Sequence, residues 1–262
     1  MRLEMISRRA EGQARETPIL FVHGAWHGAW CWDEHFLRYF SRHGYPAHAL
    51  SLRGHGGSEG RERLRWTSIA DYVSDVAHTA AQLRRPPVVV GHSMGGHVVQ
   101  KYLEDHPAPA AVLLASVPHY GALPATVRVA LRHPIVFARA NLTLNLYRLV
   151  STLDLTREAF FSEGMPRAEL ERYASQIQDE SYRAFLDMVF LNLPRLSRVK
   201  TPILVIGGSD DGLFRPREFR ATARAYGATA VIQPGAAHDL MLEPSWQTAA
   251  DTILAWLNER GL

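Results

Sequence analysis

The chain alternates between short apolar runs and longer segments whose apolar residues recur at helical spacing. Consecutive apolar positions over four to seven residues are typical of strands buried on both faces of a parallel sheet. Residues 3–9 are expected to add a strand at one edge of the sheet. The other predicted strands cover 18–22, 47–52, 87–90, 111–117, 202–206 and 229–233.

Helical spacing of apolar residues fills most of the gaps between these strands. Ser68 followed by Asp71 predicts a helix start, because both side chains can satisfy free backbone N–H groups. Alternating strands and helices predict an α/β fold with a mostly parallel sheet and helices on both faces. The predicted helices cover 32–40, 69–83, 96–103, 217–226 and 246–257.

The alternation breaks between residues 119 and 198, where no convincing strand occurs. This stretch predicts an all-helical cap at 119–198, inserted into a core formed by 1–118 and 199–262. We expect the cap to be an insertion and not an independent domain. Its helix-like segments are rich in leucine and aromatic residues and cover 127–137, 142–153, 167–178 and 182–191.

Composition and charge are those of an ordinary globular protein with a sizeable core. The 262 residues are 47% hydrophobic and 21% charged, with a net charge of +3. The arginines are scattered, and no basic block carries interleaved aromatics, so we expect no nucleic-acid partner. The short run 61–65 is expected to be a solvated loop.

The lone cysteine and the N-terminal residues bear on cellular location. Cys31 has no intrachain partner and is expected to be a small buried hydrophobe. Residues 1–9 lack the apolar core of a signal peptide, and no stretch reaches 18 apolar residues. We therefore expect a soluble, cytoplasmic protein without stable membrane insertion.

A pentapeptide at 91–95 carries the clearest candidate chemistry. Gly91-His92-Ser93-Met94-Gly95 follows a β-branched run and precedes an amphipathic helix. That context predicts a sharp strand-to-helix turn with Ser93 at its apex, where only small neighbours fit two residues to either side. Ser93 is therefore the candidate nucleophile.

A serine hydroxyl needs a base, a group that orients the base, and donors for the oxyanion. In open parallel sheets such groups lie beyond the carboxyl ends of the strands. The loop after 202–206 offers two acids, Asp210 and Asp211, and His238 follows the last strand. His238 is thus the candidate base, and either aspartate could orient it.

Two backbone N–H groups are expected to form the oxyanion hole. One is that of Met94, at the positive end of the helix that follows Ser93. The other is expected from the loop after 18–22, with Ala25 preferred over Trp26. Trp26 is also a candidate wall of the substrate pocket.

These motifs resemble the α/β-hydrolase superfamily over nearly the whole chain outside the cap. The resemblance implies the order Ser93, Asp211, His238 for a catalytic triad. In that family the acid stands three residues after the glycine that closes its strand, so the choice is Asp211 if this glycine is Gly208 and Asp210 if it is Gly207. We prefer Asp211. The matching motifs are 21–24, 53–58, 91–96, 208–211 and 235–238.

The finer resemblances point in two directions. The loop 23–32 is similar to that of plant methylesterases and hydroxynitrile lyases, whereas 91–96 and the cap look more like lysophospholipases or monoacylglycerol lipases. Both imply a hydrolase of carboxylic esters, and the apolar cap suggests a small hydrophobic or aromatic substrate.

Other activities share the same residues. Thioester hydrolysis, C–C bond hydrolysis, a slow-turnover ligand-binding protein and a cofactor-free lyase or oxygenase remain open alternatives. Epoxide hydrolysis and haloalkane dehalogenation are disfavoured, because relatives with those activities carry aspartate at the position of Ser93. No metal-ligand spacing or nucleotide-binding motif occurs, so we expect no metal and no cofactor.

Overall fold

The computed structural model describes residues 1–262, which form a seven-stranded sheet in the order β1-β3-β2-β4-β5-β6-β7. Only β1 runs antiparallel to its neighbour, and every other pair is parallel. The mostly parallel α/β fold is therefore confirmed. The strands are β1 (Met5–Arg8), β2 (Ile19–Val22), β3 (Ala47–Leu50), β4 (Val88–His92), β5 (Ala111–Leu114), β6 (Ile203–Gly208) and β7 (Ala230–Gln233).

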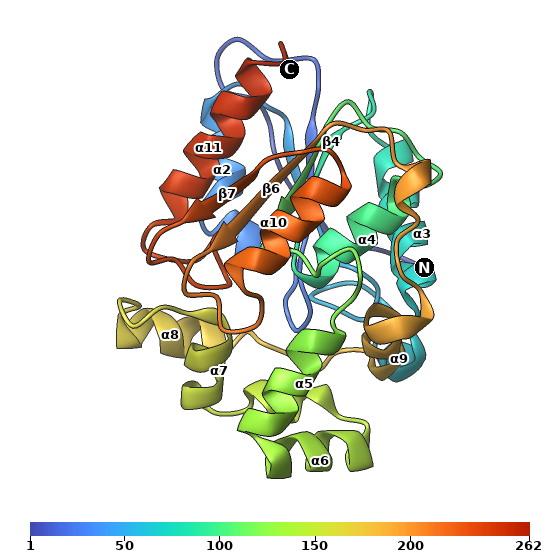
Figure 1. The fold of residues 1–262 in the computed structure, drawn as a ribbon. Coiled ribbons are helices and arrows are strands. Elements are labelled where there is room, and N and C mark those ends of the chain that lie inside the picture. The colour runs from blue at the N-terminus through green and yellow to red at the C-terminus, as the bar shows by residue number, and fades with distance from the viewer.

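Helices cover both faces of the sheet (Figure 1). On one face α2 (Phe36–Arg42) packs against α11 (Trp246–Asn258). On the other lie α3 (Ile69–Ala81), α4 (Met94–Tyr102) and α10 (Pro216–Ala225). Every residue of β2, β4 and β5 is buried between the two layers, as their continuous apolar runs require.

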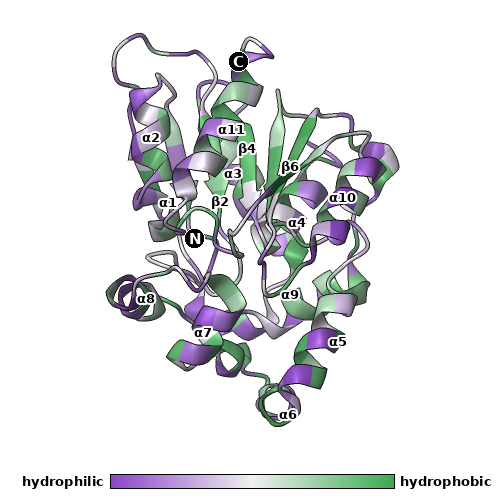
Figure 2. Cartoon of the chain, turned by 60° about the vertical axis from the view of Figure 1, so that its left-hand side comes forward, coloured by the Kyte–Doolittle hydropathy of each residue, from purple (hydrophilic) through white to green (hydrophobic).

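The chain between β5 and β6 contains helices and no strand. Most of these helices gather beyond the carboxyl ends of the strands, apart from the two layers that cover the sheet (Figures 1 and 2). The last turn, at residues 196–198, instead lies beside the C-terminal end of α4, where Arg198 pairs with Asp105. The 119–198 segment is thus helical as expected, while its treatment as a cap unit stays our interpretation. Its elements are α5 (Leu123–Arg132), α6 (Pro134–Thr143), η2 (Leu146–Val150), α7 (Leu153–Phe160), α8 (Arg167–Ala174), α9 (Tyr182–Leu186), η3 (Asp187–Leu191) and η4 (Leu196–Arg198).

Several predicted helix boundaries were wrong. The helix expected at 32–40 is two short helices, α1 (Trp30–Asp33) and α2, separated at Glu34 and His35. The helix expected at 127–137 breaks at His133, because the residue before a proline is disfavoured in helical conformation. Within 142–153 the only complete element is the 3₁₀ turn η2, because residues 142–143 end α6 and residue 153 begins α7. Residues 61–65 lie in the 3₁₀ helix η1 (Arg61–Trp66) instead of a loop.

Other local predictions are confirmed. Ser68 and Asp71 form a reciprocal capping box at the start of α3, in which each side chain accepts from the other residue's backbone N–H. Cys31 is fully buried. None of the helices combines the length and the hydropathy that a membrane crossing needs.

Candidate active site

Ser93 stands at a strained turn between β4 and α4. Its backbone has φ 51° and ψ −117°, a conformation that costs a non-glycine residue roughly 1–3 kcal/mol. The two flanking glycines explain how the turn closes. A Cβ on Gly91 would lie 2.4 Å from the carbonyl oxygen of Gly95, and one on Gly95 would lie 2.4 Å from those of Val22 and His23. Only glycine fits at either position.

Asp211 and His238 form a buried pair beyond the ends of β6 and β7. Nδ1 of His238 lies 2.8 Å from Oδ2 of Asp211, and both side chains are almost completely shielded from solvent. The other carboxylate oxygen accepts from the backbone N–H groups of Leu213 and Phe214, each at 2.8 Å. Asp211 is thereby held in one orientation with both oxygens engaged.

Asp210 occupies a different environment. It is exposed, and its carboxylate accepts from the hydroxyl of Ser209. The strand β6 closes with Gly208, so the position three residues beyond that glycine is Asp211. The structure therefore brings Asp211 to His238 and leaves Asp210 at the surface.

The second ring nitrogen of His238 is free. Its Nε2 atom is buried and has no hydrogen-bond partner in the protein. The ring packs against His92, the residue before Ser93, and against Phe214, which lines a cavity together with Ser93. With Nδ1 donating to Asp211, Nε2 carries the lone pair that a general base needs.

The loop after β2 approaches the serine closely. A Cβ on Gly24 would lie 2.9 Å from Cβ of Ser93, so this glycine lets the loop pass over the turn. Ala25 and Met94 line the same cavity as Ser93, and neither backbone N–H donates to another protein atom. Both groups are available to a ligand. The N–H of Trp26 is not, because it donates to Oε2 of Glu180 at 3.3 Å.

A second buried ion pair lies beside His238. Nε2 of His27 is 2.9 Å from Oδ2 of Asp239, and both side chains are inaccessible. Burial disfavours the charge of His27, but the carboxylate of Asp239 outweighs it and raises the pKa of His27. Burial likewise opposes the charge of Asp239, and the His27 pair lowers the pKa of that carboxyl. Both ring nitrogens of His27 face an acceptor, the carbonyl oxygen of Ala25 and Oδ2 of Asp239, an arrangement that favours the cationic ring.

His92 is a neutral neighbour of this pair. Burial, and then the nearby ring of His238, lower its pKa to about 3, and its Nε2–H donates to the carbonyl oxygen of His238. His92, His238 and Asp239 bring ligand atoms within 4.8 Å of one another. The contacts to Asp211 and His27 already engage two of the three residues, so we assign no metal to this cluster.

An apolar cavity of about 90 Å³ lies over Ser93. Fourteen of its 17 lining residues are hydrophobic, which suits an apolar group and excludes a strongly hydrated one. Trp26 is part of the wall. A wider and more polar cavity of about 750 Å³ adjoins it and reaches Asp210 and Asp211. The two cavities share Trp26, Val129, Leu149 and Leu213.

Sequence reasoning missed His27, Asp239 and Glu180. His27 lies in the loop that was expected to supply an oxyanion donor. It is one of 13 histidines, however, and nothing in the sequence indicates its distant partner, Asp239. Asp239 directly follows His238 and could have been noticed for that reason. Glu180 lies in the cap segment, where the sequence carries no motif.

The profile of the alpha/beta hydrolase family matches residues 19–251. The chain belongs to this family, which places it among the hydrolases. A non-heme haloperoxidase of Rhodococcus erythropolis is 27% identical over 249 residues, covering 85% of this chain and 86% of that protein. The monoacylglycerol lipase of Mycolicibacterium smegmatis is 23% identical over 235 residues, covering 85% and 81% respectively.

Plant methylesterases match a smaller part of the chain. Putative methylesterase 15 of Arabidopsis thaliana is 29% identical over 111 residues, which cover 41% of this chain and 24% of that protein. Among solved structures, a putative non-heme bromoperoxidase of Mycobacterium tuberculosis H37Rv superimposes with a TM-score of 0.78. That match has 19% identity and covers 99% of this chain and 97% of that one. The resemblance predicted from the motifs is confirmed at the level of the family and the fold.

Proposed function

We propose that this protein is a serine hydrolase that cleaves carboxylic esters with small hydrophobic acyl groups through an acyl-enzyme. The observation that supports the proposal is the buried pair of Asp211 and His238, in which Nε2 is free and the ring packs against His92, the residue before the strained Ser93. The names of the relatives include lipases, methylesterases and haloperoxidases, so the choice of reaction depends on the geometry of this chain.

The proposed first step is acylation. Oγ of Ser93 attacks the ester carbonyl carbon while Nε2 of His238 accepts the hydroxyl proton. The N–H groups of Ala25 and Met94 bind the oxyanion of the tetrahedral intermediate. His238 then donates the proton to the leaving alkoxide, which departs as the alcohol. Asp211 holds the imidazole in the required tautomer and stabilises its cationic form.

The second step is hydrolysis of the acyl-enzyme. Nε2 of His238 takes a proton from water, the resulting hydroxide attacks the acyl carbon, and the proton returns to Oγ of Ser93 as the carboxylic acid leaves. The same groups can attack thioesters and β-diketones. These compounds are therefore alternative substrates for the same site and mechanism.

Cavity size restricts the acyl group. An engineered protein cavity of about 150 Å³ accommodates benzene, and the cavity over Ser93, at about 90 Å³, is smaller. We therefore expect a short aliphatic acyl chain to fit without rearrangement. The alcohol part is expected to extend into the wider cavity.

A series of p-nitrophenyl esters from acetate to decanoate tests the proposal. We expect steady-state turnover on the order of 1 per second, with kcat/KM highest for acyl chains of about two to four carbons, given the size of the cavity. Ser93→Ala is expected to reduce kcat at least about 10⁴-fold. A stoichiometric burst without further turnover would instead indicate a slow-turnover binding protein, and activity that survives Ser93→Ala would indicate a different chemistry.

A further inference from the structure

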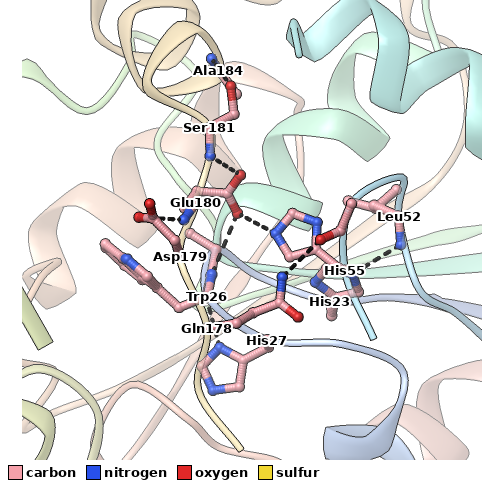
Figure 3. A network of polar contacts seen from close by, with 12 residues as sticks. His23, Trp26, His27, Leu52, His55, Gln178, Asp179, Glu180, Ser181 and Ala184 are labelled. Carbon is pink, nitrogen blue, oxygen red and sulfur yellow. Dashed lines mark hydrogen bonds and ion pairs between the residues drawn. The ribbon is translucent and has the colours of Figure 1, made fainter. Parts of the chain in front are cut away.

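The peptide bond between Ala25 and Trp26 is held from both sides by buried side chains of opposite charge. On one side, Nδ1 of His27 donates to the carbonyl oxygen of Ala25 at 2.7 Å. On the other side, the N–H of Trp26 donates to Oε2 of Glu180 at 3.3 Å, and Figure 3 shows Glu180 facing Trp26. The next N–H toward the N-terminus is that of Ala25, which is free and lines the cavity of Ser93.

Each of the two charges is fixed by partners of its own. Asp239 pairs with the other nitrogen of His27 at 2.9 Å. Glu180 is fully buried, and besides Trp26 it accepts from Nε2 of His55 at 3.0 Å, from the hydroxyl of Tyr72 at 2.8 Å and from the N–H of Ser181 at 2.6 Å. Four donors on one carboxylate leave it no freedom to rotate away from Trp26.

Glu180 belongs to the chain between α8 and α9, and a neighbour on the same stretch also contacts the loop. The backbone N–H of Gln178 donates to the carbonyl oxygen of Trp26 at 3.0 Å. The side chain of Gln178 spans to the loop after β3, donating to the carbonyl of Gly54 and accepting from the N–H of Gly56. Both polar backbone groups of Trp26 are thus bound by residues 178–180 (Figure 3).

Trp26 needs such support because its backbone is strained. Its φ is 67°, in the left-handed region, which a bulky residue occupies only when its surroundings impose it. If the Ala25–Trp26 peptide rotated, the carbonyl oxygen of Ala25 would turn toward the carboxylate of Glu180 and lose its donor, His27. The two charges therefore favour a single orientation of this peptide.

We infer that Glu180 is a positioning residue for the reaction. From the segment between α8 and α9 it fixes the Ala25–Trp26 peptide and so aims the N–H of Ala25 at the oxyanion. The inference rests on the proposed function, because it assumes that Ala25 is an oxyanion donor. It makes the loop geometry, and with it the rate of the chemical step, depend on a residue outside the sheet.

Glu180→Gln tests this role. The amide keeps the shape but offers one acceptor oxygen where two oxygens now serve four donors, so the Trp26 contact is weakened. A donor displaced by a fraction of an ångström stabilises the transition state less. Glu180 also lines the cavity of Ser93, but glutamine has the same shape there, so binding of the uncharged ester should change little. We expect kcat for p-nitrophenyl acetate to fall about 10- to 100-fold with KM changed less than about 3-fold. Inhibition by a trifluoromethyl ketone, which mimics the oxyanion, is expected to weaken by a similar factor.

Asp187→Asn is the matched control. Asp187 is also a buried carboxylate outside the core strands that accepts a core backbone N–H, that of Ile69 at 3.0 Å, but it does not contact the loop of Ala25. The kcat of the Asp187→Asn variant is expected to stay within about 2-fold of the wild type, because Asp187 positions no oxyanion donor. An equal loss of kcat in both variants would show a general effect of cap stability and would overturn the role of Glu180.

A second variant covers the case in which Glu180→Gln does not fold. Glu180→Asp keeps the negative charge for His55 and Tyr72, but its shorter side chain withdraws from Trp26, so the same selective loss of kcat is expected. A folded variant of either kind with wild-type kcat overturns the inference and leaves the proposed function intact. A wild-type protein without ester turnover would overturn both.

Discussion

At the residue scale, two adjacent aspartates differ completely in what surrounds them. Asp211 is buried, contacts His238 and accepts from two backbone N–H groups, whereas Asp210 is exposed and bonds only to Ser209. The difference arises from the path of the chain after β6, which turns the side chain of Asp210 outward and that of Asp211 inward.

Replacing each aspartate by asparagine should therefore give opposite results. Asp211→Asn keeps the shape but allows the wrong imidazole tautomer, so kcat is expected to fall by about 10⁴. Asp210→Asn is expected to keep kcat within about 2-fold, since an exposed turn residue contributes no orientation to His238. Kinetics on p-nitrophenyl acetate would measure both. A large loss in the Asp210 variant alone would show that the acid has been assigned to the wrong residue.

The buried pair of His27 and Asp239 should make stability depend on pH in a defined window. The pair stabilises the fold only while both residues are charged. Burial opposes both charges, but the attraction between the two residues is larger, so the pKa of His27 is raised and that of Asp239 is lowered. Its contribution should thus be complete from about pH 4 to about pH 6.5, the unfolded-state values. It should be lost as pH rises through the raised pKa of His27, and as pH falls through the lowered pKa of Asp239.

Urea unfolding of the wild type and of a His27→Gln/Asp239→Asn double variant, from pH 5 to pH 9, measures this contribution. The difference between their free energies of unfolding should be greatest near pH 5–6.5 and decrease at alkaline pH. A difference that grows with rising pH would mean that His27 is neutral in the folded protein.

Residue identity alone predicted some of these features and not others. Ser93, Asp211 and His238 could be proposed because each follows a recognisable strand, and the structure places the last two in contact. Asp239 lies 212 residues from His27, and Tyr72, His55 and Trp26 lie 108 to 154 residues from Glu180, so no local pattern reveals these contacts. The catalytic roles of Ser93, Asp211 and His238 and the positioning role of Glu180 stay predictions.

At the scale of elements, the contact between β2, β4 and α4 determines how sharply the chain turns at Ser93. Gly95 in the first turn of α4 touches the carbonyl groups at the end of β2, so helix and strand approach as closely as their backbones allow. This contact holds the loop of Ala25 against the serine. The close approach at this turn was predicted from the two glycines of the pentapeptide 91–95.

Gly95→Ala should be costly for that reason. Its Cβ would lie 2.4 Å from two backbone oxygens, which cannot move without separating α4 from β2. We expect a loss of about 3 kcal/mol in the free energy of unfolding. Gly164→Ala, where the nearest atom lies 3.7 Å away, should leave stability unchanged or raise it by up to about 1 kcal/mol. Equal values for the two variants would show that the close approach is not structurally important.

Element boundaries were predicted less well than element types. The strands buried on both faces were located because their apolar runs are continuous. The helices between β5 and β6 were not delimited, because Leu and aromatic residues continue across the breaks at His133 and in η2, where local geometry and not hydrophobicity ends a helix. The side chains of this segment that line the cavity therefore could not be chosen from the sequence.

At the scale of the whole molecule, the site exists only where distant segments meet. Ser93 follows β4, Asp211 follows β6, His238 follows β7, and the cavity above them is completed by helices from the 119–198 segment. The mostly parallel α/β fold and the family could be predicted from the sequence, whereas the size of the cavity could not, since it depends on how these helices pack. The cytoplasmic location also stays a prediction.

Because of this assembly, the reactivity of Ser93 is a property of the folded protein. An isolated serine hydroxyl is too weak a nucleophile to react at an appreciable rate at neutral pH, so a reagent specific for activated serines should distinguish the folded site from the unfolded chain. The urea-unfolded protein and a folded Ser93→Ala variant provide the two controls.

The most direct measurement is labelling with a fluorophosphonate, followed by mass spectrometry of the peptides. We predict stoichiometric modification of Ser93 in the folded wild type, slower labelling in Asp211→Asn, and none in the Ser93→Ala variant or in urea. Folded wild-type protein that leaves Ser93 unmodified, or modification at another serine, would contradict the proposal that Ser93 is the nucleophile.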